Sequence, residues 1–525
     1  MSNKSPDSKT KPEKKFISKE KLHQFGISKK GESINDVFTR VSKAITKTEL
    51  DSKFSNSEEL KDFQEKITTL MEDQKFIPST TILMNAGRFN KIPLSACAVP
   101  PVDLQKDLNE VKKSVDDFHF SGMGTGFNFD DIENPIETIN YLNQLGIDGQ
   151  NNKKQLRPVG NMGILSIDHP KILEYIELKK ADRHKEWVFN FSVTINDKNL
   201  EKIKNKESIT LKNNKKIDSD KLLSAISEVI HTTGDPGLIY IDRLNNDNQV
   251  PTAGNYQSLA PCGEVGLAAG ETCQFSYLNL GEFVENGEIN YQELERVVIL
   301  VTRFLDDVVE YNISRYSNET SKKVTEDKRK IGIGVCGLAD LLKKLDIEYS
   351  SDESFNLVEN LFSYINYVSK KTSIDLAKQR GSFGKFDESK YVSEDNIIKN
   401  YSHKATDTVS KDQWIELEKN IKLNGIRNCA TITLPPTGRS SLLINASQSI
   451  EPYFKDIVSI STKKQLLMVT KIQKFVDESI SKTVNIPSHS SPEEIKEVIK
   501  MSISLGLKGI TLYRDKSRLN QPTKL

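Results

Sequence analysis

The chain has 525 residues, 36% of them hydrophobic, and a formal net charge of +1. This length accommodates one large domain, or two to three ordinary ones, with a sizeable hydrophobic core. The near-neutral charge gives no sign of a nucleic-acid partner, and no apolar run is long enough to span a bilayer, so neither nucleic acid nor a membrane is expected as a partner.

The chain begins with MSNKSPDSKTKPEKKF, which is rich in Lys and Ser and lacks the apolar stretch of a signal peptide. We interpret residues 1–30 as a disordered basic tail, with an interaction arm as the alternative. The protein is therefore expected in the cytoplasm, where thiols stay reduced. Its five cysteines are scattered and include no C-x-x-C pair, which argues against a disulfide framework and a structural zinc site.

Helical patterns dominate residues 31–76, and after Pro78 short apolar runs alternate with Gly and Pro turns. Strands are predicted at 160–168, 187–197, 330–336, 427–433 and 508–515, where β-branched and aromatic residues gather. Helices are predicted at 169–180, 218–234, 291–312, 337–345, 354–379, 466–485 and 492–506. Residues 402–412 are predicted to be a polar loop. This alternation indicates an α/β architecture with a mostly parallel sheet or barrel.

Two glycine-containing motifs are candidates for ligand contacts. Gly122–Gly126 (GMGTG) continues into a strand-like run, so a tight turn with close backbone approach is favoured over a dinucleotide site. Pro436–Ser441 (PTGRSS) follows a predicted strand, and such a turn can present backbone N–H groups to an anion. A phosphate site and a plain strand–helix turn both remain open there. The histidines have no metal-ligand spacing, and His169 is interpreted as a residue near a helix start rather than a ligand.

The cysteines fall into two kinds. Cys336 and Cys429 lie among apolar residues and are expected to be core thiols. Cys262 is flanked by Pro and Gly on a turn, two residues before Glu264. A neighbouring carboxylate raises the pKa of a thiol, which disfavours a thiolate nucleophile. The pair makes better sense if the sulfur reacts as a neutral radical and the carboxylate acts separately as a base.

Around these residues the chain resembles the catalytic chain of ribonucleotide reductases, and in particular the adenosylcobalamin-dependent class II enzymes. The segment LAPCGEVGL…ETCQFSYLNL is similar to that family's NPCGE and ESCNLGSINL patterns. Further segments follow in family order, among them STTILMNAGRFNKIPLSACAVPPV, SGMGTGFNF, GDPGLIYIDRLNNDN, KRKIGIGVCGLADLL and RNCATITLPPTGRSSLL, over roughly residues 75–518. SKTVNIP and GLKGITLYRD, with no adjacent Tyr-Tyr pair, favour class II over class I.

The resemblance implies a ten-stranded α/β barrel with a central finger loop over residues 77–518. A helical region at 31–76 would precede it, and a short tail at 519–525 would follow. Cys262 would carry a thiyl radical at the loop tip, Glu264 would be the general base, and Cys97 and Cys273 would supply the reducing equivalents and end as a disulfide. The cofactor would be adenosylcobalamin, and the product would be deoxyribonucleotides for DNA synthesis.

The resemblance also implies the partners and the substrate contacts. The partners would be a ribonucleotide substrate and a thioredoxin-like or other dithiol reductant, with a nucleotide effector and a second copy of the chain as further candidates. The PTGRSS turn would bind the substrate phosphates, and other residues match positions where family members contact substrate. The expected contacts are Thr80, Thr81, Ser95, Ala96, Gly124, Ala260, Pro436, Thr437, Gly438, Arg439 and Ser440.

The sequence departs from the family pattern in four places. Ala260 replaces the Asn of NPCGE, which hydrogen-bonds the reacting ribose in the family; losing such a contact costs on the order of 10²–10³ in rate. A polar segment at 132–156 and RPVGNMG replace the Gly- and Ser-rich and Arg-rich loops, so effector specificity is open. No cysteine pair follows residue 513, so re-reduction would need an external reductant, another chain or an altered reaction. ETCQFSYLNL replaces CNLGSINL while keeping the cysteine.

Three hypotheses follow. The first is a working adenosylcobalamin-dependent ribonucleotide reductase, favoured by the presence of Cys97, Cys262, Cys273 and Glu264. The second is a divergent paralogue without reductase turnover that serves as a nucleotide-binding or regulatory protein, favoured by Ala260. The third is a radical enzyme that modifies a nucleotide without net reduction, which would not need the Cys97 and Cys273 pair.

Overall fold

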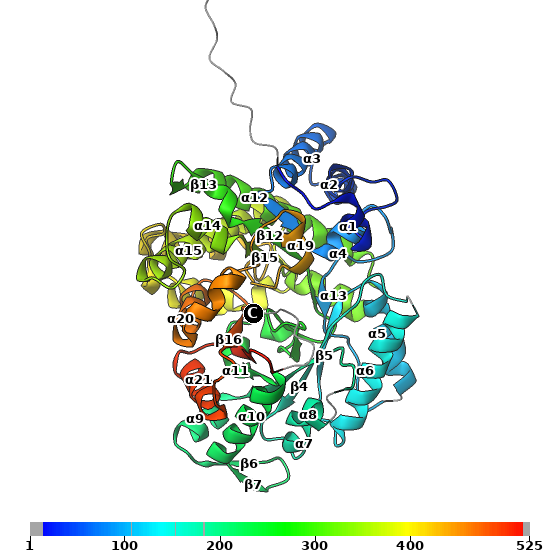
Figure 1. Cartoon of the computed structure of the whole chain (residues 1–525). Helices are drawn as coiled ribbons and strands as arrows, with labels where there is room; N and C mark the ends of the chain where they lie inside the picture. The colour runs from blue at the N-terminus through cyan, green and yellow to red at the C-terminus, as the bar shows by residue number, and fades with distance from the viewer. Residues whose placement is uncertain (1–13, 107, 153, 182–183, 518–525) are drawn as a thin grey trace, which may run out of the picture.

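A helical layer forms one end of the molecule (Figure 1). The computed structural model describes residues 14–106, 108–152, 154–181 and 184–517. Helices α1 (Lys19–Gln24), α2 (Ile34–Asp51) and α3 (Ser57–Glu72) make up this layer. Helices α2 and α3 both begin with a capping box, from Ser33 with Asp36 and from Asn56 with Glu59. The prediction of an N-terminal helical region is confirmed, and its bounds of 31–76 stay a prediction.

The first described residues differ from the predicted disordered tail. Residues 14–30 contain α1, and Leu22 and Ile27 are buried in the hydrophobic core. Burial of these two side chains, with Phe16, Ile17 and Phe25 packed against the same core, anchors the segment. Residues 1–13 and the predicted tail at 519–525 lie outside the described residues.

An eight-stranded sheet forms the second half of the molecule. Its strands are β2 (Cys97–Ala98), β3 (Gly124–Asn128), β4 (Asn161–Ser166), β5 (Phe189–Ile195), β8 (Gly237–Tyr240), β11 (Thr272–Cys273), β16 (Thr483–Ile486) and β17 (Gly509–Arg514). Strands β2, β3, β4, β5 and β8 run parallel and are neighbours in that order. At one edge β11 pairs antiparallel with β2; at the other, β17 pairs antiparallel with β8 and parallel with β16.

A three-stranded sheet lies nearer the helical layer. It consists of β1 (Phe76–Pro78), β12 (Phe275–Asn279) and β15 (Gly332–Cys336). Isolated parallel bridges, Ile333 with Ile432 and Leu434 with Ile480, continue its edge toward β16. The strand pairs of the described residues do not close into a ring, so the ten-stranded count is not confirmed. The mixed α/β class with an N-terminal helical region is confirmed.

Three short hairpins complete the strands: β6 (Ser208–Thr210) with β7 (Lys216–Asp218), β9 (Ser258–Leu259) with β10 (Gly266–Leu267), and β13 (Val284–Glu285) with β14 (Glu288–Ile289). The β9–β10 hairpin lies between the two sheets, because β9 packs on β3 and β4 while the loop it carries bonds to residues 433 and 479.

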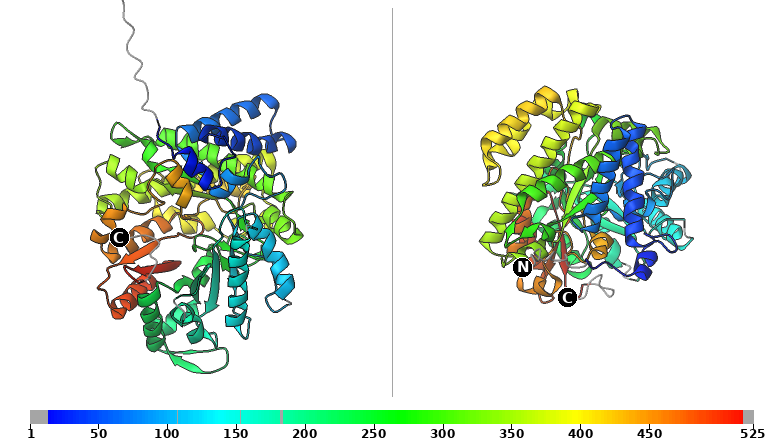
Figure 2. Two further views of the ribbon diagram at one scale, coloured as in Figure 1. Left: turned by 45° about the vertical axis from the view of Figure 1, so that its right-hand side comes forward. Right: turned by 90° about the horizontal axis from the view of Figure 1, so that it is seen from above.

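Helices cover both sheets: α5 packs on β3, α6 lies beside α5, and α10 and α21 lie together at the far end (Figures 1 and 2). They are α4 (Thr80–Asn85), α5 (Leu108–Phe120), α6 (Pro135–Asn151), α7 (Ile172–Ile176), α8 (Leu178–Ala181), α9 (Asp197–Lys204), α10 (Ser219–Thr233), α11 (Ile241–Asn246), α12 (Tyr291–Ile313), α13 (Glu319–Lys328), α14 (Leu338–Lys344), α15 (Asp352–Arg380), α16 (Lys390–Ser393), α17 (Asn396–Asn400), α18 (Lys411–Asn424), α19 (Gly438–Leu443), α20 (Thr462–Gln473) and α21 (Pro492–Ser504). Short 3₁₀ turns are η1 (Pro251–Ala253), η2 (Leu280–Phe283), η3 (Phe386–Glu388), η4 (Ser402–Lys404) and η5 (Phe454–Ser459). None of the helices in the described residues is both long and apolar enough to span a membrane.

Two sequence-based predictions of secondary structure were wrong in part. The helix predicted at 466–485 ends at Gln473, and residues 483–486 form strand β16. The chain leaves the helix because the Asp477 carboxylate turns inward, where it pairs with Lys370 at 2.8 Å and accepts the backbone N–H of Thr431 at 2.8 Å. The strand predicted at 427–433 is reduced to the isolated bridges at 432 and 434.

Candidate active site

The β9–β10 hairpin holds Cys262 at the tip of its loop. A tight turn forms the tip, with the Gly263 N–H donating to the Ala260 carbonyl at 2.9 Å and the Ala260 N–H donating to the Val265 carbonyl at 3.0 Å. Gly263 has φ +77°, a conformation that glycine adopts without cost. The Cys262 side chain is exposed, unlike the other four cysteines, because it faces a cavity.

Glycines in β3 allow the loop to pass close to the eight-stranded sheet. A Cβ atom on Gly126 would lie 2.1 Å from the Leu259 carbonyl oxygen, and one on Gly124 would lie 2.5 Å from Cγ of Pro261. Any larger residue would push the loop away from the strand. The prediction of close backbone approach for the GMGTG motif is therefore confirmed, and so is the strand that follows it.

Glu264 lies on the buried side of the same loop. Its carbonyl oxygen accepts hydrogen bonds from the Ser479 N–H at 3.0 Å and from the Thr433 hydroxyl. Its Oε2 atom is buried and has no hydrogen-bond partner among the described residues. Burial raises the pKa of Glu264 to about 7, against the opposing effect of the Glu264 and Cys262 backbone N–H groups and the Arg157 charge. The carboxyl group is thus poised to exchange a proton near neutral pH with a group placed against Oε2.

The Cys262 thiol is held in its neutral form. Although the side chain opens onto a cavity, desolvation by the surrounding protein raises its pKa; the charge of Glu264 raises it further, and the charge of Arg157 lowers it. The sequence-based argument that Glu264 would disfavour a thiolate at Cys262 is confirmed by these directions. Chemistry at this sulfur is better matched to hydrogen-atom transfer than to attack by a thiolate.

Cys97 and Cys273 are partners across two antiparallel strands. Cys97 of β2 lies directly opposite Cys273 of β11, and its Sγ lies 3.9 Å from the Cys273 carbonyl oxygen. Directly opposite residues in antiparallel strands have Cα atoms roughly 4.5–5.5 Å apart. That spacing falls inside the range of roughly 4.4–6.8 Å that a disulfide needs. Both thiols are buried, and burial raises the pKa of each well above its ordinary value.

The thiol pair lies beside the loop that carries Cys262. Cys97 pairs with Gly124 in β3, and Gly124 is the residue that approaches Pro261. The charge of Glu264 contributes to the raised pKa of both Cys97 and Cys273. The structure therefore brings together the four residues that the sequence singled out as chemically active.

The predicted phosphate turn is assembled from two short helices. Ser440 at the start of α19 donates to the Pro78 carbonyl at 3.1 Å and lies 3.5 Å from the Thr80 hydroxyl of α4. Thr437 donates to Ser441 at 3.0 Å. Thr81 is buried and bonds to Ser79 at 3.0 Å. Pro436 accepts a hydrogen bond through its carbonyl, and Gly438 has φ +46°, which fits a sharp turn.

Two other predicted substrate residues, Ser95 and Ala96, immediately precede strand β2 and its Cys97, and a third, Ala260, lies in the β9–β10 loop. The Ser95 hydroxyl lies 3.0 Å from both Thr272 and Tyr316, so protein groups already engage it. The Ala96 N–H donates to the Cys273 carbonyl at 2.8 Å, and the Ala96 carbonyl accepts the Gly124 N–H at 3.0 Å. Ala260 is fully buried.

Arg439 points away from the turn that it was predicted to serve. Its guanidinium lies over the Phe25 ring, 5.0 Å from the centroid, and donates to the Phe25 carbonyl at 3.3 Å. This contact joins the predicted phosphate turn to the N-terminal segment. Its charge still acts on Arg157, whose pKa it lowers.

Sequence reasoning missed Arg157 and Tyr277. The Arg157 guanidinium donates to the Gly122 carbonyl at 2.7 Å, and no carboxylate of the described residues pairs with it. Its pKa is lowered by burial, with the charges of Tyr277 and Cys262 acting in the opposite direction. The Tyr277 hydroxyl donates to the Pro436 carbonyl at 3.3 Å, and burial and the Glu264 charge raise its pKa. The signals were present in RPVGNMG and in the tyrosine of ETCQFSYLNL.

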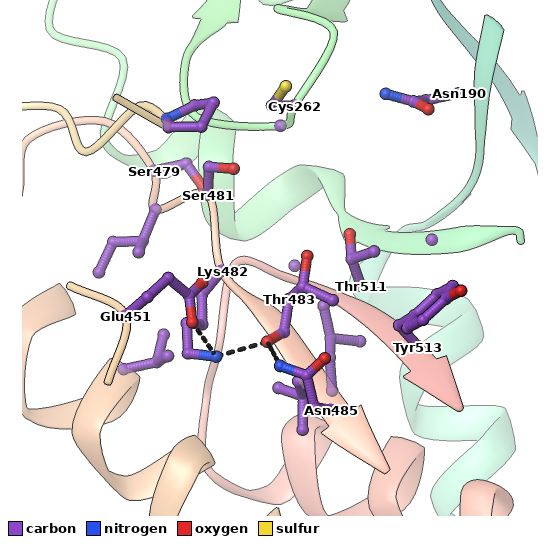
Figure 3. A pocket seen from close by; sticks show the side chains of 18 of the residues that line it. Asn190, Cys262, Glu451, Ser479, Ser481, Lys482, Thr483, Asn485, Thr511 and Tyr513 are labelled. Carbon is purple, nitrogen blue, oxygen red and sulfur yellow. Dashed lines mark hydrogen bonds and ion pairs between the residues drawn. The ribbon is translucent and has the colours of Figure 1, made fainter. Parts of the chain in front are cut away.

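A cavity of about 540 Å³ opens beside Cys262, which is one of the residues that line it (Figure 3). Strands β16 and β17 and the segments around 447–453 and 479–485 form its walls. Hydroxyl and amide side chains project into it, among them Ser479, Ser481, Thr483, Asn485 and Thr511. The Lys482 ammonium pairs with Glu451 at 2.7 Å on its floor. Cys262 lines this cavity, and Glu264 of the same loop is buried.

Comparison with known families covers most of the chain. The family model described as ribonucleotide reductase, barrel domain, matches residues 131–459 and 453–513. The model described as ribonucleotide reductase, all-alpha domain, matches residues 23–91. The chain belongs to the ribonucleotide reductase large-chain family. Within this family, the all-alpha match coincides with α2 and α3, and the barrel match includes the loop with Cys262 and the PTGRSS turn.

Several curated ribonucleotide reductases are similar to the chain. A vitamin B12-dependent ribonucleoside-diphosphate reductase of Thermoplasma acidophilum is 32% identical over 86% of this chain and 65% of its own length. A protein of the same name from Mycobacterium tuberculosis is 25% identical over 87% of this chain and 72% of its own. The ribonucleoside-diphosphate reductase subunit alpha of Chlamydia trachomatis is 28% identical over 46% of this chain and 24% of its own. The chain thus spans slightly less than two thirds of the length of the Thermoplasma relative.

Proposed function

We propose that this protein reduces ribonucleotides to 2′-deoxyribonucleotides with Cys262 as a thiyl radical. The observation that carries the proposal is the juxtaposition of the Cys262–Glu264 loop with the opposed Cys97 and Cys273 thiols. One site holds a neutral thiol, a carboxyl group with a pKa of about 7 and a dithiol that can close to a disulfide. Family membership and the relatives named vitamin B12-dependent reductases support the same reaction.

The first half of the proposed reaction uses Cys262 and Glu264. The Cys262 sulfur radical takes the hydrogen atom from C3′ of the ribose, which forms an S–H bond and leaves the radical on the sugar. The ionised Glu264 accepts the 3′-hydroxyl proton through its unpartnered Oε2. The 2′-hydroxyl then leaves as water. The loop places the sulfur and the carboxyl group two residues apart on the same turn, so both can reach one sugar.

The second half consumes the dithiol. Cys97 and Cys273 give two electrons and two protons to the site as their S–H bonds are lost and one S–S bond forms. One proton accompanies the departing 2′-hydroxyl and the other hydrogen ends on C2′. Glu264 returns its proton to the 3′-oxygen, which restores the ionised carboxylate. The hydrogen atom held by Cys262 returns to C3′, which restores the sulfur radical. A dithiol reductant of the thioredoxin type would then reduce the disulfide for the next turnover.

The cavity beside Cys262 fits the cofactor that the relatives' names indicate. Its wall presents hydroxyl and amide groups, and the corrin ring of adenosylcobalamin carries amide side chains that pair with such groups. Ser479, Ser481, Asn485 and Thr511 would hold the cofactor by these contacts. When bound, adenosylcobalamin supplies the organic radical that oxidises a thiol by one electron. The Cys262 side chain is the thiol exposed to that cavity.

The remaining contacts are part of the same proposal. The turn at Pro436, Thr437, Gly438 and Ser440, with Thr80 and Thr81, would bind the substrate phosphates, while Ser95, Ala96, Gly124 and Ala260 would border the sugar. A nucleotide effector and a second copy of the chain are further proposed partners. The cytoplasmic location also stays a proposal.

Ala260 favours a second candidate function, a nucleotide-binding or regulatory paralogue without turnover. Its side chain is fully buried and offers no hydrogen bond to a ribose. Such a protein would bind nucleotides and keep the fold, but it would form no deoxynucleotide.

One assay separates the two candidates. The purified protein is incubated with adenosylcobalamin, dithiothreitol and each ribonucleoside di- or triphosphate, and deoxynucleotide is measured by chromatography. The proposal predicts deoxynucleotide with at least one substrate, and none from Cys262→Ser, which should still bind the nucleotide. Nucleotide binding without product in the unaltered protein would favour the paralogue and contradict the reductase.

A further inference from the structure

The hairpin that carries Cys262 is too short to hold itself in place. Strands β9 and β10 have two residues each, and isolated hairpins are marginal even when longer. Its cross-strand bonds use the carbonyls of Val265 and Leu267, which accept the N–H groups of Ala260 and Gln257. Gly266 lies between Val265 and Leu267, and its N–H and carbonyl point away from β9, to the outer edge of the hairpin. Backbone polar groups that are buried there need hydrogen-bond partners.

An ion pair supplies both partners of Gly266. The Lys330 ammonium donates to the Gly266 carbonyl at 2.8 Å, and the Gly266 N–H donates to Glu478 Oε2 at 3.3 Å. Lys330 and Glu478 pair with each other at 3.0 Å through Oε1. The N–H and the carbonyl of Gly266 are thus both hydrogen-bonded by the two side chains of one ion pair.

Tyr256 fixes this arrangement sterically. Its hydroxyl donates to Glu478 Oε1 at 2.7 Å and accepts from Lys330 at 3.1 Å. A Cβ atom on Gly266 would lie 2.2 Å from Cδ2 of the Tyr256 ring, so the ring packs where only glycine leaves room. Lys330 and Glu478 are 3% and 1% exposed, so water does not replace these contacts.

The same charges connect the loop to the strand of Cys273. Lys330 pairs with Glu271 at 3.0 Å, and Glu271 pairs with Lys328 at 2.8 Å, which balances two cations with two anions. Glu271 also accepts the Ala268 N–H at 2.8 Å and immediately precedes β11. Next to Glu478, the Ser479 N–H holds the Glu264 carbonyl at 3.0 Å. The cluster therefore touches the loop at 264, 266 and 268.

A buried ion pair is by itself weak evidence for stability, because well-packed apolar residues often replace such pairs without loss. Here the pair does something that an apolar pair cannot do. It offers a donor and an acceptor to the two outward polar groups of Gly266. This distinction separates a role in positioning from a role in packing.

We propose that Lys330 and Glu478 are positioning residues that clamp the backbone of Gly266 and thereby hold Cys262 and Glu264 toward Cys97 and Cys273. The catalytic meaning of this clamp rests on the proposed function. The clamp itself is a property of the loop and can be measured without substrate.

The decisive variant is the double replacement Lys330→Met with Glu478→Met. It removes both charges together and leaves Lys328 and Glu271 paired, so the unfolding midpoint should stay near that of the unaltered protein. Backbone amides at 258–267 should nevertheless exchange with deuterated solvent about tenfold faster or more, because the outer edge of the hairpin has lost its partners. Iodoacetamide should alkylate Cys262, the exposed cysteine, faster by a similar factor.

A second pair of variants keeps the test valid if the double variant does not fold. Glu478→Gln keeps the side-chain shape and leaves Lys330 paired with Glu271, and it should accelerate exchange at 258–267. Glu49→Gln is the matched control, since Glu49 of α2 is fully buried and pairs with Arg303 of α12 and Arg380 of α15. It should lower the unfolding midpoint and leave exchange at 258–267 unchanged.

Two results would overturn the proposal. One is a stable double variant whose loop exchanges and alkylates like that of the unaltered protein. The other is equal loop exchange in Glu478→Gln and Glu49→Gln. In an active protein, the clamp further predicts a lower kcat with little change in the KM for nucleotide. Exchange and alkylation decide the clamp even if no deoxynucleotide forms, so its failure and that of the proposed function are distinguishable.

Discussion

Cys97 lies directly opposite Cys273 across the antiparallel β2–β11 pair, and β3, which touches the Cys262 loop, lies on the other side of Cys97. The pairing fixes the two thiols by backbone register rather than by side-chain packing. A disulfide between them needs side-chain rotation and no rearrangement of the strands. Both thiols are enclosed by the fold.

Oxidation should produce one specific disulfide. When the protein is oxidised with diamide, peptide mapping by mass spectrometry should find Cys97 joined to Cys273. Cys97→Ser and Cys273→Ser should each lose multiple turnover with dithiothreitol, whereas Cys429→Ala, at a buried cysteine outside the pair, should retain it. A disulfide that joins Cys262 or Cys429 instead would show that the strand register does not set the redox pair.

Activity should have an acidic limb set by Glu264. Its pKa is raised to about 7 by burial, and only the ionised form accepts a proton. The kcat/KM for nucleotide should therefore fall about tenfold for each pH unit below about pH 7. Glu264→Gln should remove the limb together with most of the activity. A pH profile that is flat between pH 5 and pH 8 would exclude Glu264 as the base.

The same carboxyl group should cost stability at alkaline pH. The pKa of Glu264 rises from an ordinary value of 4.5 to about 7 in the folded protein, so folding favours the protonated form. The stability that it contributes is fully present below about pH 4.5 and is lost as the pH rises through 7, by about 3 kcal/mol in total. Glu264→Gln should raise the free energy of unfolding by about that amount at pH 8, and by little at pH 4. Urea unfolding at both pH values measures the difference, and equal effects would contradict burial as its cause.

Ala260 should limit the rate. Ala260→Asn adds a hydrogen-bonding side chain at the residue before Pro261, next to the reacting thiol. If the missing contact is to the ribose, kcat should rise by about tenfold or more, because such donors act mainly on the transition state. Steady-state kinetics on folded Ala260→Asn measures the change. A folded variant with unchanged kcat would show that Ala260 is not the cause of a slow reaction.

Arg157 should contribute to nucleotide affinity. Its guanidinium donates to the Gly122 carbonyl at 2.7 Å, and its charge lowers the pKa of both Cys262 and Glu264. No carboxylate of the described chain forms an ion pair with it. Arg157→Met should weaken nucleotide binding by about 10–100-fold, the loss expected for a hydrogen bond to a charged group. Arg243→Met is the control, because Arg243 bonds to carbonyls of Ile503 and Leu507 near α21. Calorimetry with ribonucleoside diphosphates that finds equal affinities would rule out this role.

The sequence could predict the residues whose neighbours are close along the chain. Cys262 and Glu264 share one turn, and the helices ending at Gly234 and Gly381 have C-terminal glycines that mark them. The core positions of Cys336 and Cys429 also followed from apolar neighbours. Local pattern was sufficient in each of these cases.

The rest depended on contacts between distant segments. The contacts of Gly266 with Lys330 and Glu478 form only in the folded chain. The sequence around Lys330 and around Glu478 has no pattern that marks these two charged side chains as buried. Arg439 turned toward Phe25, a residue 414 positions away, and so left the turn in which it was expected. The helix predicted at 466–485 failed because Asp477 is used to bond Thr431 and Ile432. Tertiary hydrogen bonds of Asp477 thus outweighed the helix propensity of that segment.

A single-turnover measurement tests the central claim most directly. Protein reduced beforehand and freed of external thiol is mixed with adenosylcobalamin and the ribonucleotide that it binds best, and deoxynucleotide and free thiols are counted. The account predicts about one deoxynucleotide for each chain, with loss of the Cys97 and Cys273 thiols alone and no product from Cys262→Ser. Product without that disulfide, or no product from protein that binds both ligands, would contradict it.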